Sequence, residues 1–117
     1  MRVPSIESLR DVFDSDPRSV AEITTGSFLP LERWPEGEVL VSTAVAGRTL
    51  RVYLAPKIHC VRVEIDVPDT IVSLQIEGVV WVEATADAQA SKGLRIGRRE
   101  GASVEVRTSP DISLRSI

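Results

Sequence analysis

Residues 61–76 read VRVEIDVPDTIVSLQI, two runs of alternating apolar and polar residues on either side of Pro68-Asp69. Proline presets the φ angle of a turn and aspartate tolerates turn conformations, so this dipeptide suits a hairpin tip. Nearly every apolar side chain then lies on one face, whereas a slip of one residue would mix the faces. The stretch predicts an antiparallel hairpin with one buried face. The expected pairs are Val61–Ile76, Arg62–Gln75, Val63–Leu74, Glu64–Ser73 and Ile65–Val72.

Two other alternating segments predict hairpins of the same kind. Gly47-Arg48 suits a two-residue turn after residues 38–46, because glycine takes a positive φ without penalty. Residues 99–101, Arg-Glu-Gly, suit a three-residue turn with the glycine in the left-handed position. The expected pairs are Val45–Leu50, Thr43–Val52 and Val41–Leu54 in the first hairpin, and Ile96–Val104, Leu94–Val106 and Arg95–Glu105 in the second.

The apolar phase of residues 72–76 continues beyond Gly78 through Val80, Val82 and Ala84, which predicts one long strand bent or bulged at the glycine. The opposite face is polar before Gly78 but carries two large apolar residues after it. These are Val79 and Trp81. The pair predicts a covered surface, and the N-terminal helix, a second subunit and a different protein are three ways to cover it.

The two ends of the chain carry weaker signals. Ser5 is suited to cap a short helix with Ile6, Leu9 and Phe13 on one side. Asp16-Pro17 is a second helix-start signal, but within residues 17–26 a strand that begins near Val20 fits nearly as well as a helix. Residues 109–111, Ser-Pro-Asp, turn the chain into a last strand at 112–117.

These segments predict a single domain spanning residues 1–117, long enough to bury a core without disulfides. The fold class is mainly β: a small antiparallel β-sandwich or barrel of six to eight strands with a short N-terminal α-helix.

Charge is unevenly distributed along the chain, whose net charge is −3. Residues 1–38 hold eight acidic and four basic residues, whereas residues 87–117 hold four acidic and six basic ones. The basic residues near the C-terminus form a candidate anion-binding and interaction strip. They include Arg95, Arg98, Arg99, Arg107 and Arg115. Because no aromatic residue follows Glu83 to stack on bases, the pattern argues against nucleic acid as the partner.

The sequence offers little catalytic or cofactor chemistry. His59 and Cys60 are the only residues of their kinds, and at consecutive strand positions they point to opposite faces, with His59 in phase with the core. One cysteine and one histidine are too few for a zinc site, and no phosphate-binding glycine loop occurs. We therefore expect no catalytic residue, metal or cofactor.

No apolar run approaches the roughly 20 residues that span a bilayer, and the first residues lack the apolar segment of a secretory signal. The expectation is a cytoplasmic protein without membrane association.

The function that this pattern favours is a non-catalytic protein-binding domain, acting with a protein partner or as a homodimer. A specific version is a cytoplasmic immunity-type protein that neutralises a toxin, with the acidic N-terminal third facing a basic partner. The alternatives are a small ligand-binding barrel or enzyme with a pocket near Tyr53, His59 and Trp81, and a structural subunit joined through edge strands.

Overall fold

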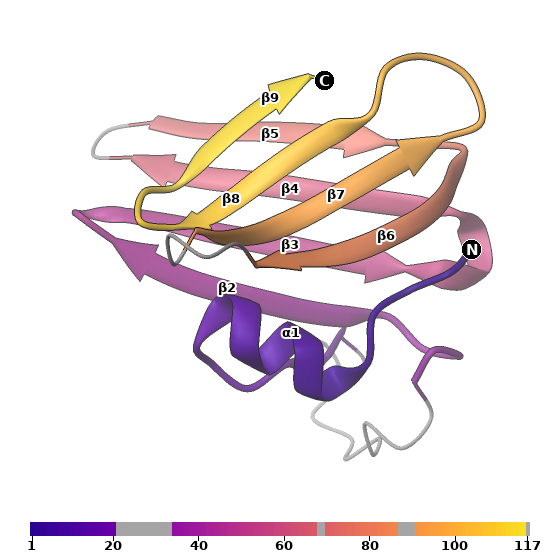
Figure 1. The fold of residues 1–117 in the computed structure, drawn as a ribbon, viewed down its shortest axis with the longest axis horizontal. Helices are drawn as coiled ribbons and strands as arrows, with labels where there is room; N and C mark the ends of the chain where they lie inside the picture. Colours follow the sequence, from indigo (N-terminus) through magenta and orange to yellow (C-terminus); the bar gives the residue numbers. More distant parts are fainter. Residues whose placement is uncertain (21–33, 68–69, 87–90, 117) are drawn as a thin grey trace.

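The computed structural model describes residues 1–20, 34–67, 70–86 and 91–116. Within them the chain is mainly β and forms two antiparallel sheets and one short helix, α1 at Ile6–Phe13 (Figure 1). One sheet has the strand order β1-β2-β3-β4-β5 and the other β6-β7-β8-β9. The strands are β1 Arg18–Ser19, β2 Val39–Val45, β3 Arg48–Ala55, β4 Cys60–Val67, β5 Thr70–Ile76, β6 Val79–Ala86, β7 Lys92–Arg98, β8 Val104–Ser109 and β9 Ser113–Ser116.

The predicted fold class is confirmed, and of its two forms the structure is the sandwich rather than the closed barrel. The described residues form nine strands where six to eight were expected. The difference arises because β1 adds a two-residue strand and the chain breaks at Gly78, which divides one expected long strand into two.

The hairpin at residues 61–76 has the predicted register, with Val63 opposite Leu74 and Glu64 opposite Ser73. The hairpin of β7 and β8 is also confirmed, with Arg95 opposite Glu105. In both hairpins the turn and the alternation of apolar residues indicate the same pairing, and this agreement explains why the registers were predictable.

The predicted register of β2 and β3 is wrong by two residues. Val45 pairs with Arg48 and Val41 with Val52, because the turn lies at Ala46-Gly47 rather than Gly47-Arg48. Both turn residues have positive φ, 52° and 78°, as a type I′ turn requires. A shift of two residues keeps each side chain on its face, so hydrophobic alternation alone could not distinguish the two registers.

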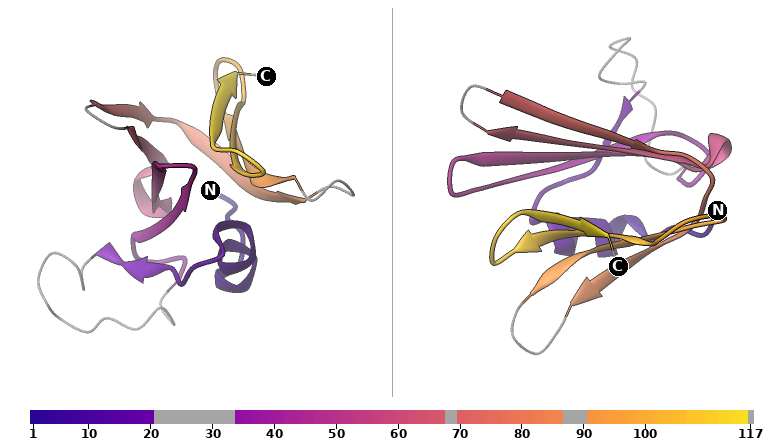
Figure 2. Two further views of the ribbon diagram at one scale, coloured as in Figure 1. Left: turned by 90° about the vertical axis from the view of Figure 1, so that its left-hand side faces the viewer. Right: turned by 90° about the horizontal axis from the view of Figure 1, so that it is seen from above.

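The strand expected to run through Gly78 is instead two strands in different sheets. β5 ends at Ile76 and β6 begins at Val79, and Gly78 has a φ of 66° at the crossover between the sheets. A residue without a side chain takes this left-handed conformation readily, so Gly78 redirects the chain out of the first sheet. The two sheets meet at this end and diverge toward the β2–β3 and β8–β9 turns (Figure 2).

Helix α1 contacts β2 on one sheet and β6 and β7 on the other (Figures 1 and 2). Ser5 caps it as predicted, accepting a hydrogen bond from the Ser8 backbone N–H at 3.1 Å. Its apolar face is buried at Leu9, Val12 and Phe13, which join the core between the sheets. The main members of that core on the strands are Val39, Val41, Leu50, Val52, Leu54, Val61, Val63, Ile76, Val79, Val82, Leu94, Ile96, Val104 and Val106.

The ends of the chain agree in part with their predictions. After Asp16-Pro17 the chain forms the two-residue strand β1 at Arg18–Ser19, and Val20 is helical. The rest of the segment predicted at 17–26 lies outside the described residues from 21 onward. The last strand, expected at 112–117, is β9. In the described part of the chain, no helix has the length and apolar character needed to cross a membrane.

Candidate functional site

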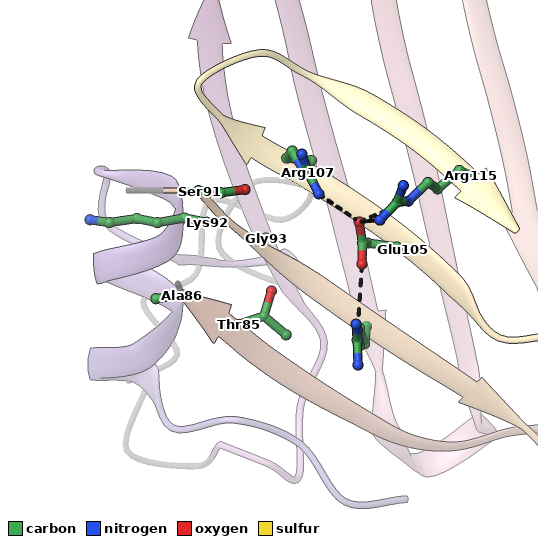
Figure 3. A pocket seen from close by; sticks show the side chains of 9 residues that line it. Thr85, Ala86, Ser91, Lys92, Gly93, Glu105, Arg107 and Arg115 are labelled. Atoms are coloured by element: carbon green, nitrogen blue, oxygen red, sulfur yellow. Dashed lines mark hydrogen bonds and ion pairs between the residues drawn. The ribbon is translucent and has the colours of Figure 1, made fainter. Parts of the chain in front are cut away.

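A depression with a volume of about 310 Å³ lies on the outer face of the four-stranded sheet (Figure 3). We call it the arginine depression. Its lining residues are Thr85, Ala86, Ser91, Lys92, Gly93, Arg95, Glu105, Arg107 and Arg115. They come from β6, β7, β8 and β9, together with Ser91 just before β7. All four strands of this sheet therefore contribute residues to the arginine depression.

Glu105 lies at the centre of the arginine depression and pairs with three arginines. Its carboxylate oxygens lie 3.4 Å from Arg95 Nε, 3.2 Å from Arg107 Nη2 and 2.8 Å from Arg115 Nη2. Arg115 also donates through Nε at 2.9 Å. The Glu105 side chain is 8% exposed, whereas those of Arg95, Arg107 and Arg115 are 50%, 36% and 56% exposed. The carboxylate is thus shielded and its partners reach solvent.

Strand register produces this arrangement. Arg95 on β7 and Arg115 on β9 lie directly opposite Glu105 on β8, one on each side. Arg107 follows Glu105 by two positions and so projects from the same face of β8. The backbone therefore fixes all three guanidinium groups around one carboxylate.

Two opposing effects set the ionisation of Glu105. Burial alone would raise the pKa of its carboxyl, but the charge of Arg115 and the hydrogen bonds from Arg115, Arg95 and Arg107 outweigh it. The pKa of Glu105 therefore lies below its ordinary value, and the group is ionised at neutral pH.

Positive charge exceeds negative charge in the arginine depression. Three arginines share one carboxylate, and Lys92 at the border pairs with Asp11 of α1 at 3.4 Å. A guanidinium carries five N–H donors, so the three arginines hold more donors than Glu105 can accept. This surface can bind an anionic group, and guanidinium geometry suits a carboxylate or a phosphate.

The five predicted arginines divide into two groups. Arg95, Arg107 and Arg115 belong to the arginine depression. Arg98 instead donates to the Ala102 carbonyl at 2.9 Å, and Arg99 lines a separate small depression near Gly78. The hairpin tip therefore does not extend the depression.

The sequence predicted the Arg95–Glu105 pair and placed Arg115 in the basic strip, but Glu105 was not identified as the shared partner of three arginines. A signal was available: Glu105 and Arg115 lie five residues before and after Pro110. A turn centred on this proline places them opposite each other, as observed.

The prediction that Val79 and Trp81 share one face of the sheet is wrong. Val79 is in the core, whereas the half-buried Trp81 lies over Gly97, where an added Cβ would come within 2.1 Å of the indole ring. A register shift between residues 79 and 81 separates the two side chains. For the same reason Val80, expected in the core, is exposed.

The N-terminal segment and the start of α1 cover part of the surface around Trp81. Arg2 forms a parallel bridge with Trp81, its N–H donating to the Val80 carbonyl at 3.0 Å. A shallow depression beside Trp81 is lined by this segment and by Ser8 of α1. The expected cover was the apolar face of the N-terminal helix, but Leu9 and Phe13 of that face lie in the core, and Arg2, before the helix, pairs with this strand instead.

The three residues of the alternative pocket line three different depressions. Tyr53 lies beside Cys60 and Arg62, His59 beside Arg99, and Trp81 beside Arg2. The Arg62 guanidinium lies 4.1 Å from the centre of the Tyr53 ring, a cation–π geometry. The structure therefore does not bring Tyr53, His59 and Trp81 into one pocket.

His59 is not at the end of the core face, as its phase suggested. It is exposed, has a φ of 53° and ends the short 3-10 helix at Pro56–Ile58, so the alternation of β4 starts only at Cys60. Burial raises the pKa of the Cys60 thiol, and Glu77 and Glu38 raise it further. Within the described ranges, no three His, Cys, Asp or Glu side chains are grouped so that they could hold a metal ion.

Comparison with known proteins gives one structural likeness. No protein-family model matches the chain, and no curated protein sequence matches it. A chain of the contact-dependent growth inhibition toxin–immunity protein complex from Klebsiella pneumoniae 342 matches its structure with a TM-score of 0.76, at 16% sequence identity. The match covers 99% of this chain and 95% of that chain. The two chains share a fold.

Proposed function

We propose that this chain is a non-catalytic, immunity-type protein that binds a toxin and thereby neutralises it. The observation that carries the proposal is the arginine depression, in which three part-exposed arginines surround one shielded carboxylate. The shared fold supports it, because the similar chain comes from a complex of a toxin with its immunity protein. Either component of such a complex uses its surface to bind the other.

The arginine depression favours a carboxylate of the partner as the bound group. A volume of about 310 Å³ accommodates one or two side chains, and the guanidinium groups are already held in place by Glu105. Prior ordering of this kind lowers the entropic cost of binding. When an acidic side chain of the toxin enters the arginine depression, it can no longer contact the toxin's substrate. The toxin would be neutralised in this way.

The acidic residues of the described N-terminal region form a less well defined contact surface. Asp16 pairs with Arg10 at 2.6 Å and Asp11 with Lys92 at 3.4 Å, so part of this charge is engaged within the chain. Electrostatic attraction of a basic partner by the remaining acids is compatible with the proposal, but the arginine depression gives the more specific contact.

The test uses the protein encoded beside this chain's gene as the candidate toxin. Both proteins are purified, their Kd is measured by calorimetry, and rescue of growth is scored when they are produced together. Replacing Arg95 and Arg115 with glutamine should weaken binding on the order of 100-fold, because the partner's anionic group loses its donors. Replacing Arg48 and Arg51, which lie in the other sheet, is the matched control and should change the Kd by less than about threefold.

Two results would contradict the proposal. One is a complex whose affinity is unchanged in the Arg95 and Arg115 variant, since the partner would then bind elsewhere. The other is tight, salt-dependent binding of an RNA oligonucleotide with no binding of the neighbouring protein, which would make phosphate the ligand of the arginine depression.

A further inference from the structure

β5 is an edge strand whose whole length except its last residue is exposed. Its sequence, TIVSLQI, contains neither a charged residue nor a proline. Figure 1 shows β5 along the border of its sheet, on the side opposite α1. Proteins usually protect such edges with charges, prolines, short strands or a covering segment, because an open edge pairs readily with another strand.

The other three sheet edges carry such protection. β1 has only two residues, one of them Arg18, and pairs with Val39 and Leu40 of β2. Beyond it, Ser15 donates a hydrogen bond to the Ser42 carbonyl and α1 contacts β2. β9 has four residues and includes Arg115. β6 is covered by the N-terminal segment, since the Val82 N–H donates to the Arg2 carbonyl at 2.8 Å. Among the described residues, β5 is therefore the one long edge without a protecting device.

Apolar side chains are exposed on both faces of β5. Ile71 is 62% exposed on the outer face, and Val72 and Leu74 are 50% and 38% exposed on the face turned toward the core. Their counterparts Val63 on β4 and Val52 on β3 are buried on that same face. The sheet thus continues its apolar face beyond the part that the second sheet and α1 cover.

Register identifies the backbone groups that point away from β4. Val67 and Thr70 close a two-residue loop, so they form a hydrogen-bonded pair. Bonded and non-bonded pairs alternate along an antiparallel ladder. The N–H and C=O groups of Ile71, Ser73 and Gln75 therefore point away from β4, toward the open edge.

We propose that an extended segment of the protein partner adds to β5 as a sixth strand of this sheet, with apolar side chains at alternate positions that cover Val72 and Leu74. This inference rests on the proposed function and locates a second contact for the same partner. β5 supplies an unpaired ladder of backbone groups and an uncharged apolar strip, which is the combination that strand addition requires.

The size of the edge favours the partner's segment over a second copy of this chain. Seven residues span roughly 23 Å. Pairing of two β5 strands alone would bury less than the roughly 1,200 Å² that stable interfaces require. A partner held at the arginine depression needs only an additional strand, because the second contact is then made within an existing complex.

Amide hydrogen exchange of the unmodified chain, free and bound to the protein encoded beside its gene, tests this inference. Addition of a strand should slow exchange at Ile71, Ser73 and Gln75, with little further change at Val72 and Leu74, which already face β4. This alternating pattern distinguishes a new strand from general shielding of the surface. A complex that forms without it overturns the strand inference and leaves the proposed function standing.

A pair of variants at Ser73 gives an independent measurement. Ser73→Pro removes the outward N–H while sparing the ladder with β4, and it should weaken binding about tenfold or more. Ser73→Ala retains that N–H and is the control, with an expected change below about twofold. Thermal unfolding of both variants checks that the hairpin remains folded, and the exchange pattern decides the question if Ser73→Pro does not fold.

Two further outcomes overturn the inference for different reasons. If the neighbouring protein forms no complex at all, the proposed function fails and the strand inference falls with it. If light scattering shows that the free chain is a dimer and that Ser73→Pro is a monomer, the occupant of β5 is a second copy of this chain.

Discussion

Each sheet carries a glutamate on its outer face held by arginines, and the two environments differ at one position. Glu64 lies opposite Arg51 on one side and two residues after Arg62, just as Glu105 lies opposite Arg95 and two residues before Arg107. On the remaining side, Glu105 has Arg115 opposite it. At the equivalent position Glu64 has Ser73, in the middle of β5.

The difference changes the charge balance of the two surfaces. In the five-stranded sheet, Asp66 also pairs with Arg51 at 3.7 Å, so two acids meet two arginines and the charges cancel. In the four-stranded sheet, three arginines meet one acid and a positive surplus remains. Balanced ion pairs satisfy one another, whereas an unbalanced cluster retains donors for an outside anion. The first sheet is therefore suited to backbone pairing at its edge, and the second to recognition of charge.

Removing the central carboxylate should affect the two sheets unequally, and this is the largest effect on stability that we expect. Glu105→Gln leaves three arginines repelling one another around a shielded site and should lower the free energy of unfolding by about 2 kcal/mol. Glu64→Gln is the matched change and should cost less than about 1 kcal/mol, because Glu64 is more exposed and Asp66 still pairs with Arg51. Urea unfolding measures both, and equal losses would remove the contrast between the sheets.

Lowering the pH should also remove the stability that Glu105 contributes, with a smaller effect than the Glu105→Gln substitution at neutral pH. Because the folded-state pKa of Glu105 is lowered, the unfolded chain takes up the proton first as pH falls. The contribution of Glu105 is present above the ordinary value of 4.5 and is lost as pH falls from there through the folded-state pKa. Between about pH 5 and 3, Glu105→Gln should therefore lose less stability than the unmodified chain. Urea unfolding at several pH values measures the free energy of unfolding of both proteins. An equal loss for the two proteins over this pH range would contradict this account.

Supplying the missing arginine should convert one environment toward the other, and this is the smallest expected effect. Ser73→Arg places a cation opposite Glu64, as Arg115 lies opposite Glu105. Cross-strand pairs of opposite charge contribute roughly 0.2–1 kcal/mol, so a slight stabilisation is expected. Ser73→Gln controls for side-chain length without the charge. A gain in the glutamine variant as large as in the arginine variant would show that charge is not the cause.

The sequence allowed prediction of those features in which two independent signals agreed. For the hairpin at residues 61–76, the turn residues and the apolar alternation indicated one register. For β2 and β3 the alternation fitted registers two residues apart, and the choice depended on whether Ala46 would take the positive φ that it has. Alanine rarely does so, and nothing local marked it.

The errors around Gly78 have a different origin. The apolar alternation continues across Gly78, but alternation does not show whether the residues before and after the glycine belong to the same sheet. The crossover at Gly78 and the register shift after Val79 depend on contacts with the second sheet. Likewise, the arginines near the C-terminus were identifiable as a basic strip, but their convergence on Glu105 required the pairing of β8 with β9.

The position of α1 has a consequence for synthesis of the chain. Thr108 on β8 donates a hydrogen bond to the Val12 carbonyl at 2.7 Å, and Lys92 contacts Asp11, so α1 is fixed by residues that follow it in the chain by 96 and 81 positions. Leu9 and Phe13 emerge from the ribosome long before β7 and β8 exist to cover them. Long-range contacts of this kind slow folding and leave apolar surface open in the meantime. The nascent chain must therefore carry this uncovered segment until β7 and β8 have been made.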